Sequence, residues 1–176
     1  DKVDGEAVGA FGSLEFKHVS FSYEGQETAV LKDISLRINA GEKIAIVGQN
    51  GSGKTTLVKL LLRFYDPTQG RILCNGRSIG EYPIASYRSQ FGTVFQDFQL
   101  FSETVAENIM VERPLSGQQR KDAETALQKA DMLERINDLP NKMDTLVGRE
   151  FAPDGAVFSG GETQKLAIAR AIAKDA

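Results

Sequence analysis

The residues whose types and spacing point most directly to chemistry form the run Gly-Gln-Asn-Gly-Ser-Gly-Lys-Thr-Thr at positions 48–56. The spacing G-x-x-x-x-G-K-T is that of a phosphate-binding loop. Glycines allow backbone conformations closed to other residues, so successive N–H groups can converge on phosphate oxygens. The residues that we expect to bind phosphate are Gly48, Asn50, Gly51, Ser52, Gly53, Lys54, Thr55 and Thr56.

Two side chains of this run have separate expected roles. Lys54 reaches the outer phosphates as a point charge, and the hydroxyl of Thr55 is a ligand for a Mg²⁺ ion that bridges them. The flanking sequence predicts a buried strand at 43–47 and a helix at 57–64, whose positive N-terminal end faces the loop. This strand–loop–helix context disfavours the alternative, an ordinary glycine-rich turn.

Length and composition indicate a single globular domain with room for an inserted subdomain. The chain has 176 residues, of which 41% are hydrophobic and 26% charged. A net charge of −3 gives no sign of a surface for polyanions, so we expect no nucleic-acid partner. The single cysteine, Cys74, has no partner for an internal disulfide. No apolar run approaches the roughly 20 residues that span a bilayer, so if the protein acts at a membrane, we expect this chain to lie on the aqueous side of it.

Strand patterns surround the phosphate loop on both sides. Residues 1–13 lack periodicity and predict a flexible linker, whereas 14–23 and 30–38 alternate apolar and polar residues, with a register shift near His18. These segments predict an antiparallel sheet beside the phosphate-loop strand. Residues 92–96 predict a second strand for a parallel core, ending at Gln96.

Helical patterns dominate from Thr104 onward. Thr104 and Glu107 have the spacing of a capping box, and 118–135 carries apolar residues at helical spacing. Residues 97–158 are therefore predicted to form a mostly helical lobe. A final helix is expected at 163–174.

The sequence Ser159-Gly160-Gly161-Glu162 precedes this final helix. A serine and two glycines at a helix start can cradle an anion, since they offer a hydroxyl, unobstructed N–H groups and a favourable dipole. Taken alone, the motif is common loop chemistry. The motif becomes more specific in combination, because Gln96 and the phosphate loop precede it in the same chain.

This ordered set of motifs resembles the ATP-binding-cassette (ABC) family, over about residues 14–176. The resemblance is closest to the nucleotide-binding domains of exporters whose membrane and ATPase domains share one polypeptide. The matching segments are 21–23 (Phe-Ser-Tyr), 48–56, 65–70 (Tyr-Asp-Pro-Thr-Gln-Gly), 94–97 (Val-Phe-Gln-Asp), 101–109 (Phe-Ser-Glu-Thr-Val-Ala-Glu-Asn-Ile), 158–162 (Phe-Ser-Gly-Gly-Glu) and 169–171 (Ala-Arg-Ala).

The resemblance implies an α/β fold, in which a P-loop NTPase core carries an antiparallel β subdomain and an inserted α-helical subdomain. The implied domains are a linker at 1–13, the ATP-binding core with its β subdomain at 14–96, the helical subdomain at 97–158, and the signature motif with the following helix at 159–176. The implied activity is that of an ATPase motor that binds ATP and Mg²⁺ on the cytoplasmic side of the cell membrane, as part of an exporter.

The resemblance also implies roles for single residues. Tyr23 stacks on adenine, although a strand aromatic that packs in the core is the alternative. Gln96 contacts Mg²⁺ and the attacking water, and joins Lys54 as a catalytic residue. Ser159, Gly160, Gly161 and Glu162 act on the nucleotide of a second such domain, arranged head to tail. The loop 144–150 touches the transporter's transmembrane domains, with a solvated charged loop as the alternative.

The sequence departs from the family pattern in three places. Phe158 and Glu162 stand where leucine and glutamine are usual. If Glu162 faces the γ-phosphate bound by the second domain, we expect repulsion to weaken the closure of the two domains on ATP. The approach at 151–154 is longer than usual. In the family, a strand that carries a Mg²⁺-supporting aspartate and a catalytic glutamate comes next, and a histidine called the switch histidine comes later. The chain as given ends at Ala176, so we expect it to lack these residues. Its one histidine, His18, does not match the switch position. We therefore expect 1–176 alone to bind nucleotide weakly and not to hydrolyse it.

Two other functions share the phosphate loop. A small-molecule kinase leaves Gln96 and Ser159 without a role. An ABC ATPase that acts on DNA or ribosomes is disfavoured by the exporter-like loop near Gly148 and by the absence of a basic stripe.

Overall fold

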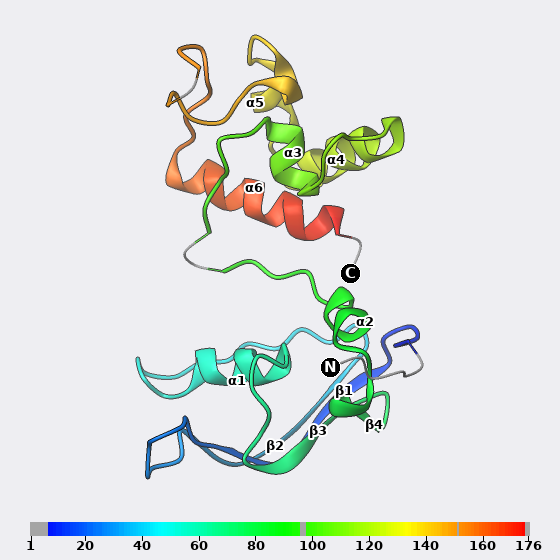
Figure 1. Ribbon diagram of the computed structural model, residues 1–176, viewed down its shortest axis with the longest axis vertical. Coiled ribbons are helices and arrows are strands. Elements are labelled where there is room, and N and C mark those ends of the chain that lie inside the picture. The colour runs from blue at the N-terminus through cyan, green and yellow to red at the C-terminus, as the bar shows by residue number, and fades with distance from the viewer. Residues whose placement is uncertain (1–6, 96–97, 151, 175–176) are drawn as a thin grey trace. The chain divides into compact units, whose positions relative to one another are not determined.

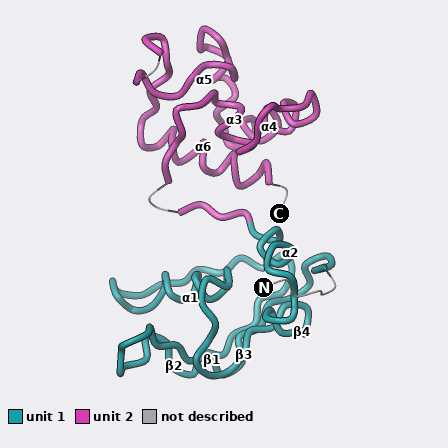
Figure 2. Tube along the Cα trace, viewed as in Figure 1, with its two compact units in different colours: residues 1–91 teal, residues 92–176 magenta. Residues whose placement is uncertain are grey.

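The computed structural model describes residues 7–95, 98–150 and 152–174. Its contacts divide the chain into two compact units, residues 1–91 and 92–176 (Figure 2). Each unit contains a hydrophobic core of its own. The predicted domain boundaries at 13/14, 96/97 and 158/159 remain predictions.

The first unit is built on an antiparallel sheet with the strand order β2-β1-β3-β4 (Figure 1). The strands are β1 (Ser13–Phe21), β2 (Leu31–Asn39), β3 (Gln69–Cys74) and β4 (Arg77–Ser78). The helices are α1 (Lys54–Leu61), α2 (Ile84–Ser89) and the 3-10 turn η1 (Ile79–Glu81). Leu57, Leu60 and Leu61 of α1 belong to the same core as the buried side chains of β1. The predicted antiparallel sheet is confirmed.

The central strand β1 keeps one face apolar across a bulge. Leu14 and Phe16 are buried, and so are Val19 and Phe21, although Val19 comes three positions after Phe16. His18 takes a φ of 51° at this point, and the pairing with β2 shifts register there. The extra residue returns Val19 to the buried face, which confirms the register shift predicted near His18.

The turn between β3 and β4 also fixes the start of the chain. Asn75 and Gly76 have φ values of 51° and 81°, as a tight turn of this dipeptide requires. The Asn75 side chain accepts a hydrogen bond from Gly12 N–H at 2.7 Å and donates one to Ala10 C=O at 2.9 Å. Val8 is 8% exposed. The described part of the predicted linker is therefore packed on the first unit.

Two predicted core strands are not formed among the described residues. Residues 43–47 and 92–95 take part in no β-ladder in this part of the chain. Ile44, Ile46 and Val47 are 51%, 48% and 88% exposed, and Val94 is 41% exposed. The prediction of a buried strand at 43–47 was wrong here because a strand in a parallel core needs hydrogen-bonded neighbours, whatever its own pattern. Gln96, at the end of the other predicted strand, lies outside the described residues.

The second unit is helical, with its core between α6 and the preceding helices (Figure 1). Its elements are α3 (Val105–Met110), α4 (Gly117–Lys129), α5 (Leu133–Asn137), the 3-10 turn η2 (Lys142–Asp144) and α6 (Gly160–Ala173). Thr104 and Glu107 form the predicted capping box at the start of α3. The buried side chains include Val105, Ile109, Leu127, Ile136 and Leu166.

The helix predicted over 118–135 is two helices, α4 and α5. Asp131 has a φ of 56°, which ends α4 in the left-handed conformation. The N–H of Met132 then donates to Leu127 C=O at 2.9 Å, and that of Asp131 to Gln128 C=O at 3.1 Å. This Schellman-type ending normally uses glycine, so an aspartate in its place gave no signal of it.

Gly70 provides a test of the packing around the bulge. Gly70 has a φ of +77°, and a Cβ there would lie 2.2 Å from His18 C=O; Gly76 has a φ of +81° with nothing within 4 Å of its Cβ. We predict that Gly70→Ala lowers the free energy of unfolding by roughly 3 kcal/mol or more, whereas Gly76→Ala costs about 1 kcal/mol from backbone strain alone. Urea unfolding measures both values, and equal losses would contradict the packing described here.

Candidate functional site

The phosphate loop, residues 48–53, leads directly into α1. Gly51 and Gly53 have φ values of 82° and 89°, and Gly53 caps the helix without a side-chain hydrogen bond. The Nζ of Lys54 donates to the carbonyl oxygens of Gly48 and Gln49, each at 2.7 Å. The ammonium group thus lies inside the curve of the loop, where it can exchange carbonyl oxygens for those of a phosphate.

Gly53 fits a position that no other residue can occupy without strain. Its φ is left-handed, and a Cβ there would lie 2.8 Å from Cδ2 of Leu31 and 3.2 Å from the carbonyl oxygen of Val30. The loop can therefore pack against the start of β2. The same glycine leaves the first N–H groups of α1 without a side-chain cap, which keeps them available for a ligand.

The two threonines after Lys54 differ in their surroundings. Thr55 is exposed, so its hydroxyl is open to a cation held between phosphate oxygens. Thr56 is 6% exposed, and its Oγ1 lies 3.0 Å from the hydroxyl oxygen of Tyr23. The structure therefore directs Thr55 toward solvent and Thr56 toward the sheet.

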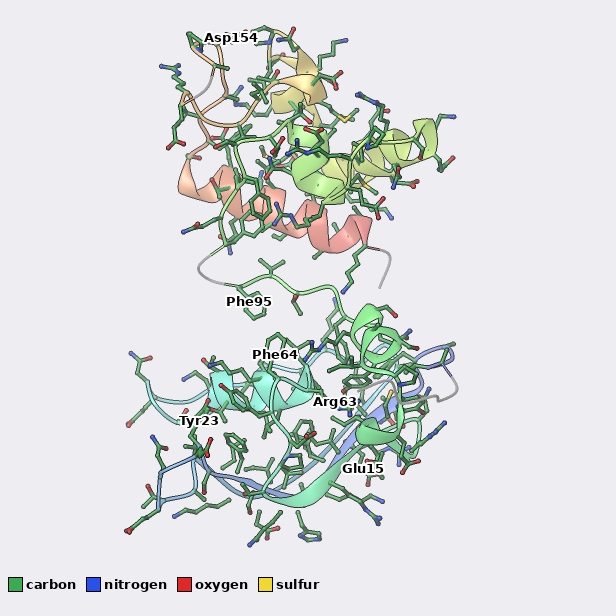
Figure 3. The ribbon with its side chains drawn as sticks, viewed as in Figure 1. Glu15, Tyr23, Arg63, Phe64, Phe95 and Asp154 are labelled. Carbon is green, nitrogen blue, oxygen red and sulfur yellow. The ribbon has the colours of Figure 1, made fainter. Side chains whose placement is uncertain are left out.

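Tyr23 is joined to α1 and to an aromatic cluster (Figure 3). Its ring centroid lies 4.9 Å from that of Phe21 and 5.4 Å from that of Tyr65, both at nearly perpendicular angles. The ring is half-buried. These contacts match the packing alternative for Tyr23 and at the same time fix this ring relative to the phosphate loop.

A buried amide organises the segment that follows Gln96. Asn108 is 1% exposed, and its Nδ2 donates to the carbonyl oxygens of Phe101, Glu103 and Thr104 at 2.9, 3.3 and 3.1 Å. Its Oδ1 accepts from Phe101 N–H at 2.8 Å. One side chain therefore adds hydrogen bonds to three carbonyl groups of residues 101–104 and supplies an acceptor for Phe101 N–H.

Arg170 of α6 completes this network. Its Nε donates to Asn108 C=O at 2.7 Å, and a terminal nitrogen donates to Asn108 Oδ1 at 3.2 Å. The guanidinium lies over the rings of Phe98 and Phe101, 4.5 and 5.2 Å from their centroids. Burial lowers the pKa of Arg170, but an arginine stays charged at neutral pH. Residues 98–104 are thus bound to α6.

The signature segment forms the N-terminus of α6. Ser159 and Glu162 form a capping box, in which Glu162 N–H donates to Ser159 Oγ at 3.3 Å and Ser159 N–H donates to Glu162 Oε2 at 2.7 Å. Gly160 and Gly161 are exposed, and a Cβ at either position would meet nothing within 4 Å. The first turn of α6 is therefore open to an approaching group.

The Glu162 carboxylate is held within its own unit. The pKa of Glu162 is lowered, first by the hydrogen bond from the Ser159 backbone, then by the Ser159 side chain and by Arg135. The Nε of Arg135 donates to Glu162 Oε1 at 2.9 Å. Arg135, which sequence reasoning missed, therefore pairs with the carboxylate that was expected to repel the γ-phosphate.

The loop 144–150 is attached to the helical unit through residues 144–148. Asp144 accepts two hydrogen bonds from Arg120, at 2.7 and 3.2 Å. Val147 N–H donates to Glu103 C=O at 2.8 Å, and Gly148 N–H donates to Ala156 C=O at 2.8 Å. The loop is thus positioned beside the segment that precedes α3.

Within the described ranges, no helix combines the length and the apolar composition needed to cross a lipid bilayer. The same residues include no group of three or more His, Cys, Asp or Glu side chains placed to hold a metal ion.

The sequence pattern of the ABC transporter family matches residues 31–176. The chain belongs to this family. The family resemblance stated from the motifs is thereby confirmed.

The proteins that are similar to this chain are longer than the chain. The chain is 42% identical over 166 residues to the ATP-dependent lipid A-core flippase of Salmonella typhimurium strain LT2, covering 94% of this chain and 28% of the flippase. For the flippase of Escherichia coli strain K12, the identity is 41% with the same coverage. The structure of a bacterial Atm1-family ABC exporter with ATP bound matches with a TM-score of 0.83 and 37% identity, over 97% of this chain and 29% of that one. This ABC transporter chain thus spans under a third of these proteins.

The structure brings some of the predicted site residues of this ABC transporter chain together. Lys54, Thr55 and Thr56 share the start of α1 with Tyr23 beside them, and Ser159 to Glu162 share the start of α6. Sequence reasoning missed Asn108, Arg135 and Arg170, because the contacts of the two arginines join residues far apart in the chain and no spacing rule predicts those of Asn108 with residues 101–104. The only local signal was that Asn108 and Arg170 lie within family-like motifs.

Removal of the Asn108 amide tests the network around residues 101–104. We predict that Asn108→Ala lowers the free energy of unfolding by about 2–4 kcal/mol, because several backbone groups and the Arg170 guanidinium lose a buried partner. Gln128→Ala, at an exposed position of α4, is the matched control and should cost under about 0.5 kcal/mol. Denaturant unfolding compares the two, and a small loss at Asn108 would refute the role given to it.

The pKa of Glu162 predicts a pH dependence for the α6 cap. Because the folded-state pKa lies below the ordinary 4.5, the carboxylate's stabilisation is fully present above that pH and is lost as pH falls through the folded-state pKa. We predict that the stability difference between the original protein and Glu162→Gln shrinks between about pH 5 and pH 2. Urea midpoints of both proteins across this range provide the measurement, and a constant difference would be the contrary result.

Proposed function

We propose that this chain is the ATP-binding domain of an ABC exporter, in which nucleotide binding closes a pair of such domains and hydrolysis reopens them. The observation that carries the proposal is the Lys54 ammonium held within a glycine-rich loop at the uncapped start of α1. The family membership and the exporter-type relatives support the same function.

The phosphates of ATP would lie against the loop. The N–H groups of residues 48–56 point toward a shared centre in such loops, and the dipole of α1 adds to their attraction. Lys54 would exchange its two carbonyl partners for phosphate oxygens, at little cost in geometry since the side chain already curls over the loop. The exposed hydroxyl of Thr55 would serve as a ligand for Mg²⁺, which supplies charge neutralisation for phosphoryl transfer.

The adenine end would rest against Tyr23. The hydrogen bond between Tyr23 and Thr56 supports this assignment, because it ties the ring to the helix that begins at the phosphates. The half-buried ring can stack on a base while its neighbours Phe21 and Tyr65 hold its orientation.

Gln96 would position the attacking water and contact Mg²⁺, as a neutral amide can both accept and donate. The network of Asn108 and Arg170 supports this role indirectly, because it fixes the segment that follows Gln96.

The signature segment would act on the nucleotide of a second domain, placed head to tail with the first. Ser159 is exposed at the start of α6, where its hydroxyl can exchange its contact with the Glu162 carboxylate for a phosphate oxygen. The exposed N–H groups of Gly160 and Gly161 and the dipole of α6 favour the same ligand. A site built this way is complete only in the dimer.

The remaining partners would be the transmembrane domains of the exporter. We place this domain on the cytoplasmic side of the membrane, where the loop 144–150 would touch those domains. Its hydrogen bonds to Glu103 and Val105 support the assignment, because they join the loop to the start of α3 and the residues before it.

Substitution of Lys54 tests the proposed function. In the full-length protein, we predict that Lys54→Ala lowers magnesium-dependent ATP hydrolysis by roughly a hundredfold or more, because the charge that stabilises the transferring phosphoryl group is lost. Lys59→Ala, in the last turn of the same helix, should keep activity within about twofold. Equal activity of Lys54→Ala and the original protein would refute the function.

A further inference from the structure

Arg135 and Glu162 link α5 to the signature segment by an ion pair. The Nε of Arg135 lies 2.9 Å from Glu162 Oε1, and the side chains are 41% and 28% exposed. The second oxygen of Glu162, Oε2, accepts a hydrogen bond from Ser159 N–H at 2.7 Å. Both carboxylate oxygens are therefore occupied, one by the helix cap and one by the guanidinium.

This pairing determines the charge that the start of α6 presents. A free carboxylate beside Ser159 would repel the terminal phosphate of a nucleotide and offset the attraction of the helix dipole. With Arg135 in contact, the local charges of the pair sum to zero. The capping hydrogen bonds also hold the carboxylate back against the first turn of α6.

The ion pair adds little to folding stability, which separates this role from a structural one. Partly exposed pairs contribute about 0–1 kcal/mol. Arg135 also lies over the Phe158 ring at 5.9 Å from its centroid, near the outer limit for a cation–π contact. The direct consequence of the Arg135 charge is thus electrostatic, at the signature segment.

We propose that Arg135 is a positioning residue of the signature segment, holding and neutralising Glu162 so that the N-terminus of α6 can receive the terminal phosphate of a nucleotide bound by the partner domain. The inference rests on the proposed function and deepens it. Arg135 acts through Glu162 and does not itself touch the nucleotide.

A four-variant cycle in the full-length protein tests this role. The variants are the original protein, Arg135→Ala, Glu162→Gln and the double variant, with Arg135→Gln added because its amide can still donate a hydrogen bond without the charge. The measurement is the ATP concentration for half-maximal closure, reported by spin labels on the two nucleotide-binding domains, together with kcat and KM for ATP hydrolysis.

We expect both Arg135 variants to raise this ATP concentration on the order of tenfold. The double variant should return to within about twofold of the original protein, because glutamine keeps the cap and removes the repelling charge. Glu162→Gln alone should close at the same or lower ATP concentration. The defect of the Arg135 variants should also shrink between about 0.05 M and 1 M salt, since screening weakens repulsion but not packing.

The control is Lys165→Ala, which removes another ion pair of α6, the one between Lys165 Nζ and Asp131 Oδ2 at 2.6 Å. It should leave closure within about twofold. Unchanged closure in both Arg135 variants, a defect that persists in the double variant, or a defect insensitive to salt would each overturn the inference while the proposed function stands. Closure that does not respond to ATP in the original protein would overturn the proposed function, and this inference with it.

Discussion

The supply of hydrogen-bond partners at helix N-termini is the constraint on which the site depends. The first N–H groups of any helix lack partners within the helix. In α3, α4 and α6, a capping box supplies them from side chains. In α1, Gly53 supplies none, and the loop curls around Lys54 instead. Helices α2 and α5 also begin without a side-chain cap, but the start of α1 is preceded by the glycine-rich loop and Lys54, which suit it to an external anion.

Features governed by neighbours in sequence could be predicted. The capping box of Thr104 and Glu107 and the shift near His18 each follow from a few adjacent residues. The phosphate loop belongs to the same class, because its glycines and lysine act within a single turn of chain. The family resemblance added the order of these motifs, which no single motif could supply.

Features that need distant partners could not be predicted. The apolar pattern at 43–47 indicates a buried strand, yet Ile44 and Ile46 stay half-exposed where no ladder neighbour is present among the described residues. The contacts of Tyr23 with Thr56 and of Arg170 with Asn108 join separate segments, and no spacing rule connects them. Asp131 ends α4 in the left-handed conformation that glycine usually takes at a helix end, so even this local feature escaped prediction.

Helix α6 makes contacts with other segments near both of its ends. Ser159 caps its first turn. Near its last turn, Arg170 donates a hydrogen bond to Asn108 and lies over the aromatic rings of Phe98 and Phe101. A helix of this length spans about 20 Å and resists bending over that distance. One stiff helix therefore joins the signature segment at its first turn to residues 98–108 near its last turn, so the two are fixed at a set distance from each other.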